Sequence, residues 1–455
     1  MLCAPVAKGG KNVLHLKSRN EAIELKWLKG LLAPIETRPQ WAFFAHAILA
    51  KAAQHSPIVK PNAKINSFLQ SWSPSQKKLP SHLRWIVQTA KKYTIQWEAI
   101  TINPSVARQL PVWFHIGASD DLNKLNNHLY AICLRDKHLA TSVGHIETIA
   151  TRNLPSHRQN KNCTCTNCSK DRGESSCDKP YKCAKLAKDI LKCILPKWHP
   201  QTSAPSYALN IAPEQITDAT DDQNKQNKIF NPIYPSPDSL SEGYHIFVSS
   251  DAPCSTPACQ APTPPGEPPQ LTTITIAGTH QIDKDGFHIS GGRAWFRMSD
   301  NRNTSIKVPE HLAAPGAGEI CAILAAIATL PVNTPLQLMV KSPALQKSLM
   351  TNLANQENID WLDHHNRTLT RMLVTHLRKR CALTTLTNTT KSADKRSTEH
   401  AINLAKEGIA KDTYDDIIVT IDAPHELLGM KLCIGTQCLF YKNIRIIQSK
   451  YKQRR

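Results

Sequence analysis

Long apolar stretches and acidic side chains are both scarce in this 455-residue sequence. Its longest apolar runs reach about ten residues, whereas a membrane-spanning helix needs about 20, so we expect no membrane span. The segment from Met1 to Lys11 contains two lysines and no long apolar region, so we expect no secretory signal. The 36 acidic residues are outnumbered by 56 basic ones, which gives a net charge of +20. This excess favours nucleic acid or another polyanion as the partner.

Two common enzyme signatures are also missing. No glycine-rich nucleotide loop and no Ser, His and Asp pattern at a useful spacing occurs, which argues against nucleotide-dependent enzymes and serine hydrolases. Fourteen cysteines are present, but six crowd into Cys163–Cys193 and the rest are scattered. Clustered cysteines in a long basic chain indicate a metal site in a reducing compartment, the cytoplasm or the nucleus, rather than a disulfide framework.

The cysteine cluster predicts a zinc site. Its pattern is Cys163-x-Cys165-x2-Cys168-x8-Cys177-x5-Cys183-x9-Cys193, with His157 and His199 on either side. Zinc takes four thiolate or imidazole ligands in a tetrahedron, and a short Cys-x2-Cys turn presents two thiolates to one ion. We expect a structural zinc knuckle whose ligands are four of Cys163, Cys165, Cys168, Cys177 and Cys183. The spacing matches no common finger closely, so reduced cysteines without metal are the alternative.

Composition divides the chain into five parts. Residues 1–150 read as an α-rich region, and residues 151–200 hold the cysteine cluster. Thirteen of the 31 prolines lie between Pro200 and Pro269, so residues 201–270 are predicted to be a proline-rich linker with one short strand at Tyr244–Val248. Residues 271–412 form a second domain, and residues 413–455 are expected to be a basic tail.

From Leu271 onward the sequence alternates between strand and helix patterns. Glu319 follows Gly316 and Gly318 and precedes an apolar repeat with helical spacing, so it lies in the first turn of a predicted helix. An acid there suits the helix dipole, and it equally suits a metal ligand. Strands are predicted near 272–276, 292–298, 305–308, 336–340 and 382–386, and helices after 318, after 343, over 358–380 and over 398–410. This βββαβαβα order predicts an α/β fold with a mixed sheet.

This order of elements resembles the ribonuclease H domain, and more narrowly the ribonuclease H region of fungal non-LTR retrotransposon polyproteins with the segment that follows their reverse transcriptase. In the C-terminal half the resemblance rests on Thr275–Thr279, Ala294–Phe296, Asn301–Pro309, Gly318–Ile320 and Glu399–Gly408. In the rest of the chain it rests on Ile23–Lys29, Phe68–Trp72, Ala90–Tyr93, Cys133–His138, the cysteine cluster up to Leu195–Trp198, Leu428–Leu432 and Tyr441–Arg445. Each motif is loose, but their order is specific and covers nearly the whole chain. No reverse-transcriptase Tyr-x-Asp-Asp motif is present.

The resemblance implies metal-dependent cleavage of the RNA strand in RNA–DNA hybrids, with two divalent ions. The family binds these ions through Asp, Glu, Asp and Asp, because hard cations need oxygen ligands. The matching positions here are Ala277, Glu319, Lys341 and Ile402, so Glu319 alone keeps a carboxylate. Magnesium is therefore expected only if the nuclease site has been rebuilt, for which Asp283, Asp285, Asp394 and Glu399 are the nearest acids in the sequence.

Three functions follow as hypotheses. The first is a non-catalytic, ribonuclease H-like pseudoenzyme that still binds an RNA–DNA hybrid or duplex. Arg378, Lys379 and Arg380 on the long predicted helix are its expected phosphate contacts, and the basic residues after Tyr441 are either further contacts or a solubilising tail. The second is an active hybrid ribonuclease with a rebuilt site. The third is a protein-interaction or assembly module, whose protein partners the sequence does not identify.

Overall fold

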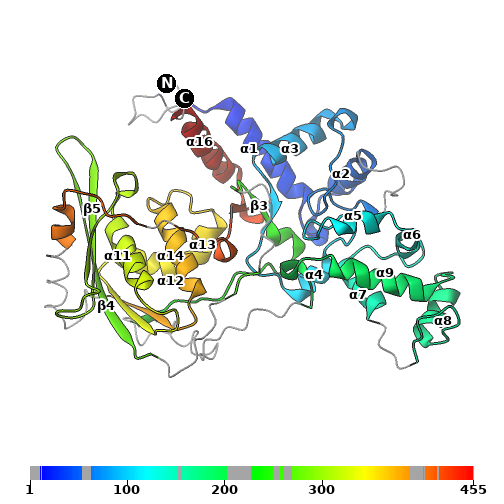
Figure 1. Ribbon diagram of the computed structural model, residues 1–455. Coiled ribbons are helices and arrows are strands. Elements are labelled where there is room, and N and C mark those ends of the chain that lie inside the picture. Colours follow the sequence, from blue (N-terminus) through cyan, green and yellow to red (C-terminus); the bar gives the residue numbers. More distant parts are fainter. Residues whose placement is uncertain are drawn as a thin grey trace. The chain divides into compact units, whose positions relative to one another are not determined.

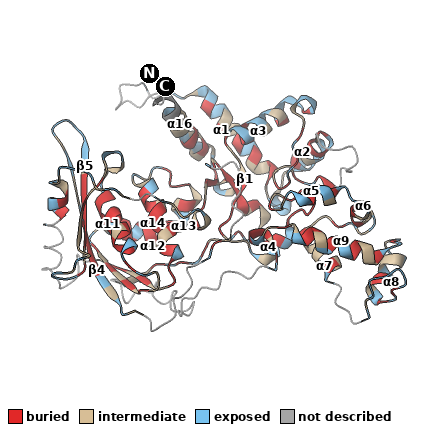
Figure 2. Cartoon of the chain, viewed as in Figure 1, coloured by how far each residue is buried: buried red, intermediate tan, exposed pale blue. Residues whose placement is uncertain are grey.

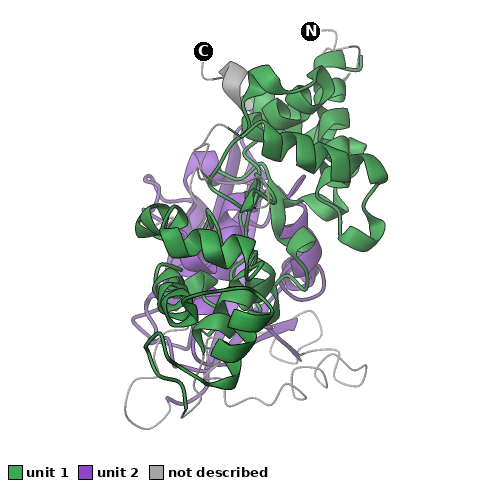
Figure 3. Cartoon of the chain, turned by 90° about the vertical axis from the view of Figure 1, so that its right-hand side faces the viewer, with its two compact units in different colours: residues 1–204, 236–257, 428–455 green, residues 205–235, 258–427 purple. Residues whose placement is uncertain are grey.

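The computed structural model describes residues 11, 13–53, 63–151, 156–201, 227–249, 257–259, 269–388, 403, 405–417 and 420–453. The chain folds as two compact units, each built from separate segments (Figure 1, Figure 3). Unit 1 comprises Met1–Ala204, Ser236–Pro257 and Leu428–Arg455, and unit 2 comprises Pro205–Pro235 and Ala258–Leu427. The part of the chain predicted to be a linker is therefore shared between the two units, and so is the predicted tail.

Unit 1 is mainly helical. Its helices are α1 (Leu16–Leu31), α2 (Gln40–Lys51), α3 (Ser81–Lys92), α4 (Pro104–Gln109), α5 (Asp121–Asn126), α6 (Leu129–Asp136), α7 (Val143–Ala150), α8 (Thr166–Gly173), α9 (Pro180–Lys192) and α16 (Gln437–Gln453). In α1 the buried residues recur every three or four positions, as expected for a helix with one face in a core. None of the described helices combines the length and apolar character needed to cross a membrane.

The end of the chain forms a helix that packs against α1, where a basic tail was expected. The Ser18 hydroxyl of α1 donates a hydrogen bond to Gln448 Oε1 of α16 at 3.0 Å, and Phe440 and Ile444 are fully buried in the core of unit 1. A small antiparallel sheet brings the three segments of this unit together, with β3 (Tyr244–Ile246) between β1 (Gln96–Trp97) and β9 (Met430–Lys431). The strand predicted inside the linker is thus present as β3, and it belongs to the core of unit 1.

Unit 2 contains a six-stranded mixed sheet in the order β2-β8-β7-β4-β5-β6. Strands β4, β7 and β8 are parallel, while β5, β6 and β2 join antiparallel. The strands are β2 (Asn227–Ile229), β4 (Thr272–Ile282), β5 (His288–Trp295), β6 (Thr304–Lys307), β7 (Leu336–Val340) and β8 (Thr384–Asn388). With α11 (Ala317–Ala328) between β6 and β7, this is the ribonuclease H-like arrangement, and the predicted fold class is confirmed. The edge strand β2 is an addition from the predicted linker.

Helices α11 and α14 (Arg367–Lys379) cover one face of this sheet (Figure 1, Figure 2). The two helices share a core with the β4 residues Ile274 and Ile276, which are almost fully buried. Glycines let α11 lie directly on β5, because a Cβ atom on Gly292 would be only 1.9 Å from the Gly318 carbonyl oxygen. The first turn of α11, and with it Glu319, is therefore fixed against the sheet.

The predicted helix over 358–380 is shorter than expected. The segment from 343 onward contains α12 (Pro343–Met350) and α13 (Leu353–Asn358), and α14 begins only at Arg367. Between α13 and α14, Asp360, Trp361 and Asp363 have φ angles of 56°, 54° and 64°, a left-handed backbone that cannot continue a right-handed helix. The apolar residues continue at helical spacing through this turn, so the predicted helix was too long. Burial of the Trp361 side chain stabilises the turn.

Candidate metal centres and the site around Glu319

Two groups of four side chains in unit 1 each place their ligand atoms within 4.8 Å of one another. We call them the His157 cluster, made of His157, Cys163, Cys165 and Cys168, and the His138 cluster, made of Cys133, His138, Cys177 and Cys183. Each combines three thiols with one imidazole, which is a ligand set that zinc takes in structural sites. Either cluster can therefore hold a metal such as zinc.

The His157 cluster is local in sequence. His157 Nδ1 lies 3.4, 3.5 and 3.6 Å from the sulfurs of Cys165, Cys163 and Cys168. A turn at Asn160, whose side chain accepts the Asn162 N–H at 3.1 Å, folds the chain back so that Cys163 approaches His157. Cys165 is the N-cap of α8, and Cys168 lies in its first turn. Short turns and one helix start thus supply all four ligands.

The His138 cluster joins more distant segments. Cys133 lies on α6 and His138 follows its end, whereas Cys177 precedes α9 and Cys183 lies in its first turn. The Cys177 sulfur is 3.6 Å from that of Cys133 and 3.7 Å from that of Cys183. The Lys137 ammonium donates a hydrogen bond to the Ser176 carbonyl at 2.6 Å. This contact holds the two ligand-bearing loops beside each other.

The spacing of ligand atoms fits a tetrahedral metal. Zn–S and Zn–N bonds of about 2.3 and 2.0 Å put the corners of a tetrahedron about 3.5–3.8 Å apart. The five separations given above run from 3.4 to 3.7 Å, and all ligand atoms of a cluster lie within 4.8 Å of one another. Since protein side chains fill all four positions in each, the geometry favours structural rather than catalytic metal sites.

The close approach of three thiols in the His138 cluster also favours metal binding. The Cys183 thiol beside Cys177 lowers the pKa of Cys177 to about 4, while burial and the neighbouring Cys177 raise the pKa of Cys133 to about 11. Without a cation, Cys177 therefore ionises most easily, and its thiolate makes ionisation of the neighbouring thiols less favourable. A divalent ion allows all three thiols to ionise, so metal binding here must release protons and weaken as the pH falls.

The sequence predicted one knuckle built from four of five cysteines, whereas the structure divides those cysteines between the two clusters. Cys163, Cys165 and Cys168 belong to one cluster, and Cys177 and Cys183 to the other. Sequence reasoning noticed His157 only as a flanking residue and missed Cys133 and His138 as ligands. The Cys133-x4-His138 spacing at a helix end was the available signal, but nothing in the sequence links it to residues some 40 positions later.

Asp171 connects the two clusters through α8. Its Oδ1 lies 3.8 Å from His138 Nδ1, and both side chains are largely buried. The other ring nitrogen, Nε2, is buried and meets no hydrogen-bond partner within the described residues, so it is the nitrogen that can take a metal. Carboxylates that contact the outer nitrogen of a ligand histidine fix the ring and raise its basicity. Helix α8 thus carries one ligand of the His157 cluster and the carboxylate that orients His138.

We expect Asp171→Asn to weaken zinc binding at the His138 cluster by about 10- to 100-fold and to leave the His157 cluster unchanged. Asp178→Asn is the matched control, because the Asp178 side chain is 89% exposed and lies 3.7 Å from the Lys137 ammonium group. Competition with a chelator, which distinguishes tightly bound from weakly bound zinc, measures the zinc affinity of both clusters. Equal loss at the two clusters, or an equal effect of the Asp178 variant, would count against the orienting role.

The second candidate site lies in unit 2, where β7 ends and the neighbouring strand β4 continues beyond their paired residues. The register pairs Ile276 with Val340, so Ala277 and Lys341 follow on adjacent parallel strands. Glu319 reaches this point over Gly278, where an added Cβ atom would lie 2.7 Å from Glu319 Cγ. The structure thus brings together three of the four positions that the ribonuclease H resemblance singles out. The fourth, Ile402, lies outside the described residues.

Glu319 is buried in this position. Only 6% of the residue is exposed, and burial raises the pKa of its carboxyl group to about 7, against the opposing effects of a hydrogen bond from Ser342 and the charge of Lys341. Its Oε2 atom has no hydrogen-bond partner within the described part of the chain. A carboxylate that bound a hard cation would be expected to meet further oxygens here.

The surrounding side chains are apolar or basic. Ala277 packs with Ala405 and Trp295. Arg293 pairs directly with Ala277 across β4 and β5, so both side chains leave the same face of the sheet. Arg293 is 7% exposed, and burial lowers the pKa of its guanidinium group, with Glu407 opposing the shift. Within the described residues this donor set does not fit two magnesium ions, because it offers one buried carboxylate, Glu319, beside two cations, and the exposed Glu407 faces Arg293.

The other acids that the sequence offered as replacement metal ligands are not placed at this site by the described residues. Asp283 Oδ1 accepts the N–H groups of Asp285 and Phe287 at 2.9 and 2.8 Å, so it closes the β4–β5 hairpin turn. Six residues along a strand separate this turn from Ala277, which corresponds to about 20 Å. Asp394 and Glu399 lie outside the described residues.

The predicted phosphate contacts on α14 need a correction, because their side chains are engaged within unit 2. Arg378 is 2% exposed and forms two hydrogen bonds to the Glu357 carboxylate, at 2.6 and 2.8 Å. Arg380 is equally buried and donates to the Thr334 carbonyl at 2.6 Å. Lys379 pairs with Asp422 at 2.7 Å. The two buried guanidinium groups anchor α14 and are not available to a nucleic-acid backbone.

Comparison with known proteins gives distant structural similarity. No protein-family model matches the chain, and no curated protein matches it. A solved structure of a foamy viral protease-reverse transcriptase in complex with dsDNA is similar over 30% of this chain and 93% of that one, with 16% identity and a TM-score of 0.24. A foamy viral protease-reverse transcriptase in complex with RNA/DNA hybrid is similar over 34% of this chain and 22% of that one, with 18% identity and a TM-score of 0.25.

Proposed function

We propose that the chain is a ribonuclease H-like protein, derived from a fungal non-LTR retroelement, that binds nucleic acid without cleaving it. One observation carries the proposal. Where β4 continues past the carboxyl end of β7, helix α11 keeps Glu319 beside the sheet, but Ala277 and Lys341 stand where the resembled family has metal-binding aspartates. The chain thus has the ribonuclease H-like fold, but two of the family's aspartate ligands are replaced at the described positions.

Charge supports the loss of catalysis. Two-metal hydrolysis requires clustered negative charge that holds both cations close together. Here Lys341 adds an ammonium group beside Glu319, and Arg293 adds a buried guanidinium group beside Ala277. These cations repel a divalent ion, and burial raises the pKa of the Glu319 carboxyl group to about 7, so the group is about half protonated near pH 7.

Charge also supports a nucleic-acid partner. The chain has a net charge of +20, and sequence-independent affinity for nucleic acid comes mainly from lysine and arginine contacts to phosphate. The clustered thiols further imply a reducing compartment, the cytoplasm or the nucleus.

A cleavage and binding experiment tests both halves of the proposal. We expect the wild-type chain to bind a labelled RNA–DNA hybrid, with affinity that falls steeply as salt rises, and to leave the hybrid intact with magnesium or manganese. Hybrid cleavage that disappears in Glu319→Gln would overturn the non-catalytic assignment. Failure to bind the hybrid or a DNA duplex at about 50 mM salt, where phosphate contacts are strongest, would overturn the nucleic-acid assignment.

A protein-assembly module is the second candidate function. It is favoured by exposed aromatic side chains on α1 and α2, since Trp27, Phe43 and Phe44 are 50%, 47% and 71% exposed. Large exposed apolar groups that gather on one surface often mark protein contacts. The same titration separates the two functions, because an assembly module needs no salt-sensitive affinity for nucleic acid.

A further inference from the structure

A groove of about 500 Å³ lies in unit 1 between the end of α7 and the C-terminal half of α9. Its polar lining consists of Thr151, Lys188, Lys192, His199 and Gln201. Leu191, Ile194 and Pro196 form the apolar part of its lining. None of these residues belongs to either metal cluster or to the site around Glu319.

Helix α9 directs a line of lysines toward solvent at this groove. Lys185, Lys188 and Lys192 are exposed and separated by three and four positions, so they share one face of the helix at about 5–6 Å per step between Cβ atoms. The opposite face, including Leu186 and Ile190, is buried in the unit 1 core. Within the described residues Lys185 and Lys188 form no ion pair, whereas Lys192 approaches Asp189 at 3.3 Å.

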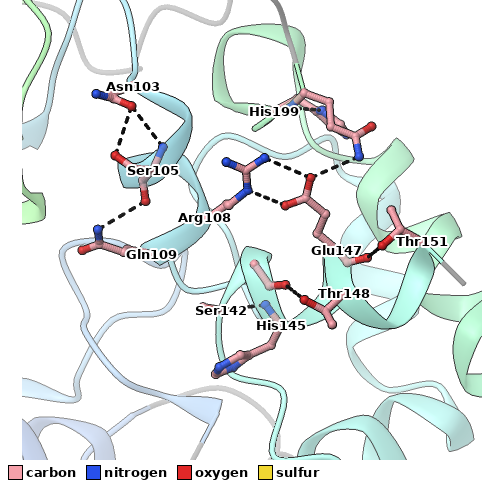
Figure 4. Close-up of polar contacts among 12 residues, drawn as sticks. Asn103, Ser105, Arg108, Gln109, Ser142, His145, Glu147, Thr148, Thr151 and His199 are labelled. Atoms are coloured by element: carbon pink, nitrogen blue, oxygen red, sulfur yellow. Dashed lines mark hydrogen bonds and ion pairs between the residues drawn. The ribbon is translucent and has the colours of Figure 1, made fainter. Parts of the chain in front are cut away.

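An acid on the α7 side of the groove is paired with an internal partner. Glu147 on α7 accepts hydrogen bonds from Arg108 Nε at 2.6 Å and from Gln201 Nε2 at 3.1 Å (Figure 4). The Arg108 guanidinium group lowers the pKa of Glu147, so this pair stays ionised and compensated. Lys188 and Lys192 on α9 are the lysines of the groove lining, and Asp189 on the same helix lies 3.3 Å from Lys192.

His199, which lines the groove together with Lys188 and Lys192, presents a hydrogen-bond donor. His199 Nδ1 accepts the Gln201 backbone N–H at 3.2 Å, and a neutral imidazole with one accepting nitrogen carries its proton on the other. Burial lowers the pKa of His199, with Glu147 opposing the shift, which keeps the ring neutral. Its Nε2–H thus supplements the ammonium groups with a neutral donor, whereas the Thr151 hydroxyl already donates to the Glu147 carbonyl at 2.8 Å.

The groove is held in a fixed shape by its surroundings. The Ser119 N–H donates to the Cys193 carbonyl at 2.8 Å, and the Leu195 N–H donates to the Gly117 carbonyl at 2.9 Å. Trp198 is 1% exposed and anchors the segment that carries His199. The first turn of α9 is tied to α6 through the His138 cluster. A preorganised site loses less conformational entropy when a ligand binds.

We propose that this groove binds the phosphodiester backbone of a nucleic acid, with Lys188 and Lys192 contacting phosphate oxygens and His199 donating a further hydrogen bond. The inference deepens the proposed function, on which it rests, by naming the contact surface. Charge complementarity selects this partner: the lysines follow one another at one-turn intervals, and the single nearby carboxylate on α7 is paired. A backbone that carries one charge per nucleotide matches such a line of cations.

Salt-dependent binding of a labelled RNA–DNA hybrid to the full chain tests the inference. We expect Lys188→Gln with Lys192→Gln to weaken binding at least 10-fold at about 100 mM salt, and to make the slope of log affinity against log salt less steep by about 2. The matched control is Lys77→Gln with Lys78→Gln, which removes two exposed lysines from another surface of unit 1. The control should change the slope much less, and Lys188→Arg with Lys192→Arg should keep the wild-type slope.

The possible outcomes separate the two proposals. Equal losses of affinity in the test and control pairs would mean that total charge alone governs binding. This result would overturn the assignment of the groove and leave the proposed function intact. A wild-type chain that binds no nucleic acid would overturn both. A loss with Lys188→Gln and Lys192→Gln that the arginine pair does not restore would also contradict the proposal, because cationic phosphate contacts tolerate that exchange.

Discussion

The chain purified in reducing buffer with zinc is expected to hold two zinc ions, and variants of either cluster are expected to hold one. Cys177→Ser removes the central sulfur of the His138 cluster, and His157→Ala removes the nitrogen that contacts all three sulfurs of the other cluster. Structural zinc contributes about 10–16 kcal/mol of apparent binding free energy in small modules, so each loss should be nearly complete. Elemental analysis of the purified protein measures the stoichiometry.

Cys193→Ala is the control for these variants. Cys193 belongs to neither cluster, and its thiol donates to the Asp189 carbonyl at 3.3 Å, so two zinc ions should remain. We also expect Cys177→Ser to lower the melting temperature of unit 1 more than His157→Ala does. The His138 cluster joins α6 to α9, whereas the His157 cluster closes a loop of neighbouring residues. A single ion in the wild type, lost in both variants, would contradict two independent sites.

The stability of unit 2 is expected to fall between about pH 4.5 and pH 7 because of Glu319. Its pKa is about 7 in the folded chain and about 4.3 when unfolded. Below the lower value the group is protonated in both states. As the pH rises, the unfolded chain loses this proton first, so unfolding becomes more favourable until the folded group ionises as well. A raised acid pKa therefore gives stability at low pH that is lost as the pH passes through 7.

Glu319→Gln should remove this dependence. The variant is expected to match the wild type near pH 4 and to exceed its free energy of unfolding by about 3–4 kcal/mol at pH 8. Glu310→Gln is the control, because Glu310 is exposed in the same unit. Denaturant unfolding at several pH values measures the difference. If magnesium stabilises the wild type but not the Glu319 variant, the residue still binds a metal and the non-catalytic proposal fails.

The sequence predicted the sheet of unit 2 because its signals are local. Strand alternation, the glycines before Glu319 and the apolar repeat of α11 each lie within a few residues, and together they set the strand order and the place of Glu319. The same analysis placed Arg378 on the surface, since its partner Glu357 lies 21 positions earlier and no local pattern reveals the ion pair. A basic residue on a helix is usually solvated, so burial had to be seen in three dimensions.

The metal centres were predicted only in part for a similar reason. Cysteine spacing identified the ligands between Cys163 and Cys183, but spacing alone cannot divide them between two ions. Cys133 and His138 join Cys177 only because α6 and α9 pack together. The groove beside α9 left no sequence signal beyond scattered lysines, because its walls come from α7, α9 and the segment after it.

The packing of α16 against α1 has a consequence for the order in which the chain folds during synthesis. Unit 2 ends at Leu427, so all its segments leave the ribosome before β9 and α16 are made. Unit 1 begins first but lacks a sheet strand and a core helix until residues 430–453 have emerged. Translation therefore completes the inserted unit before the unit that surrounds it, and a premature stop after residue 427 would spare the ribonuclease H-like sheet while leaving an apolar face of α1 uncovered.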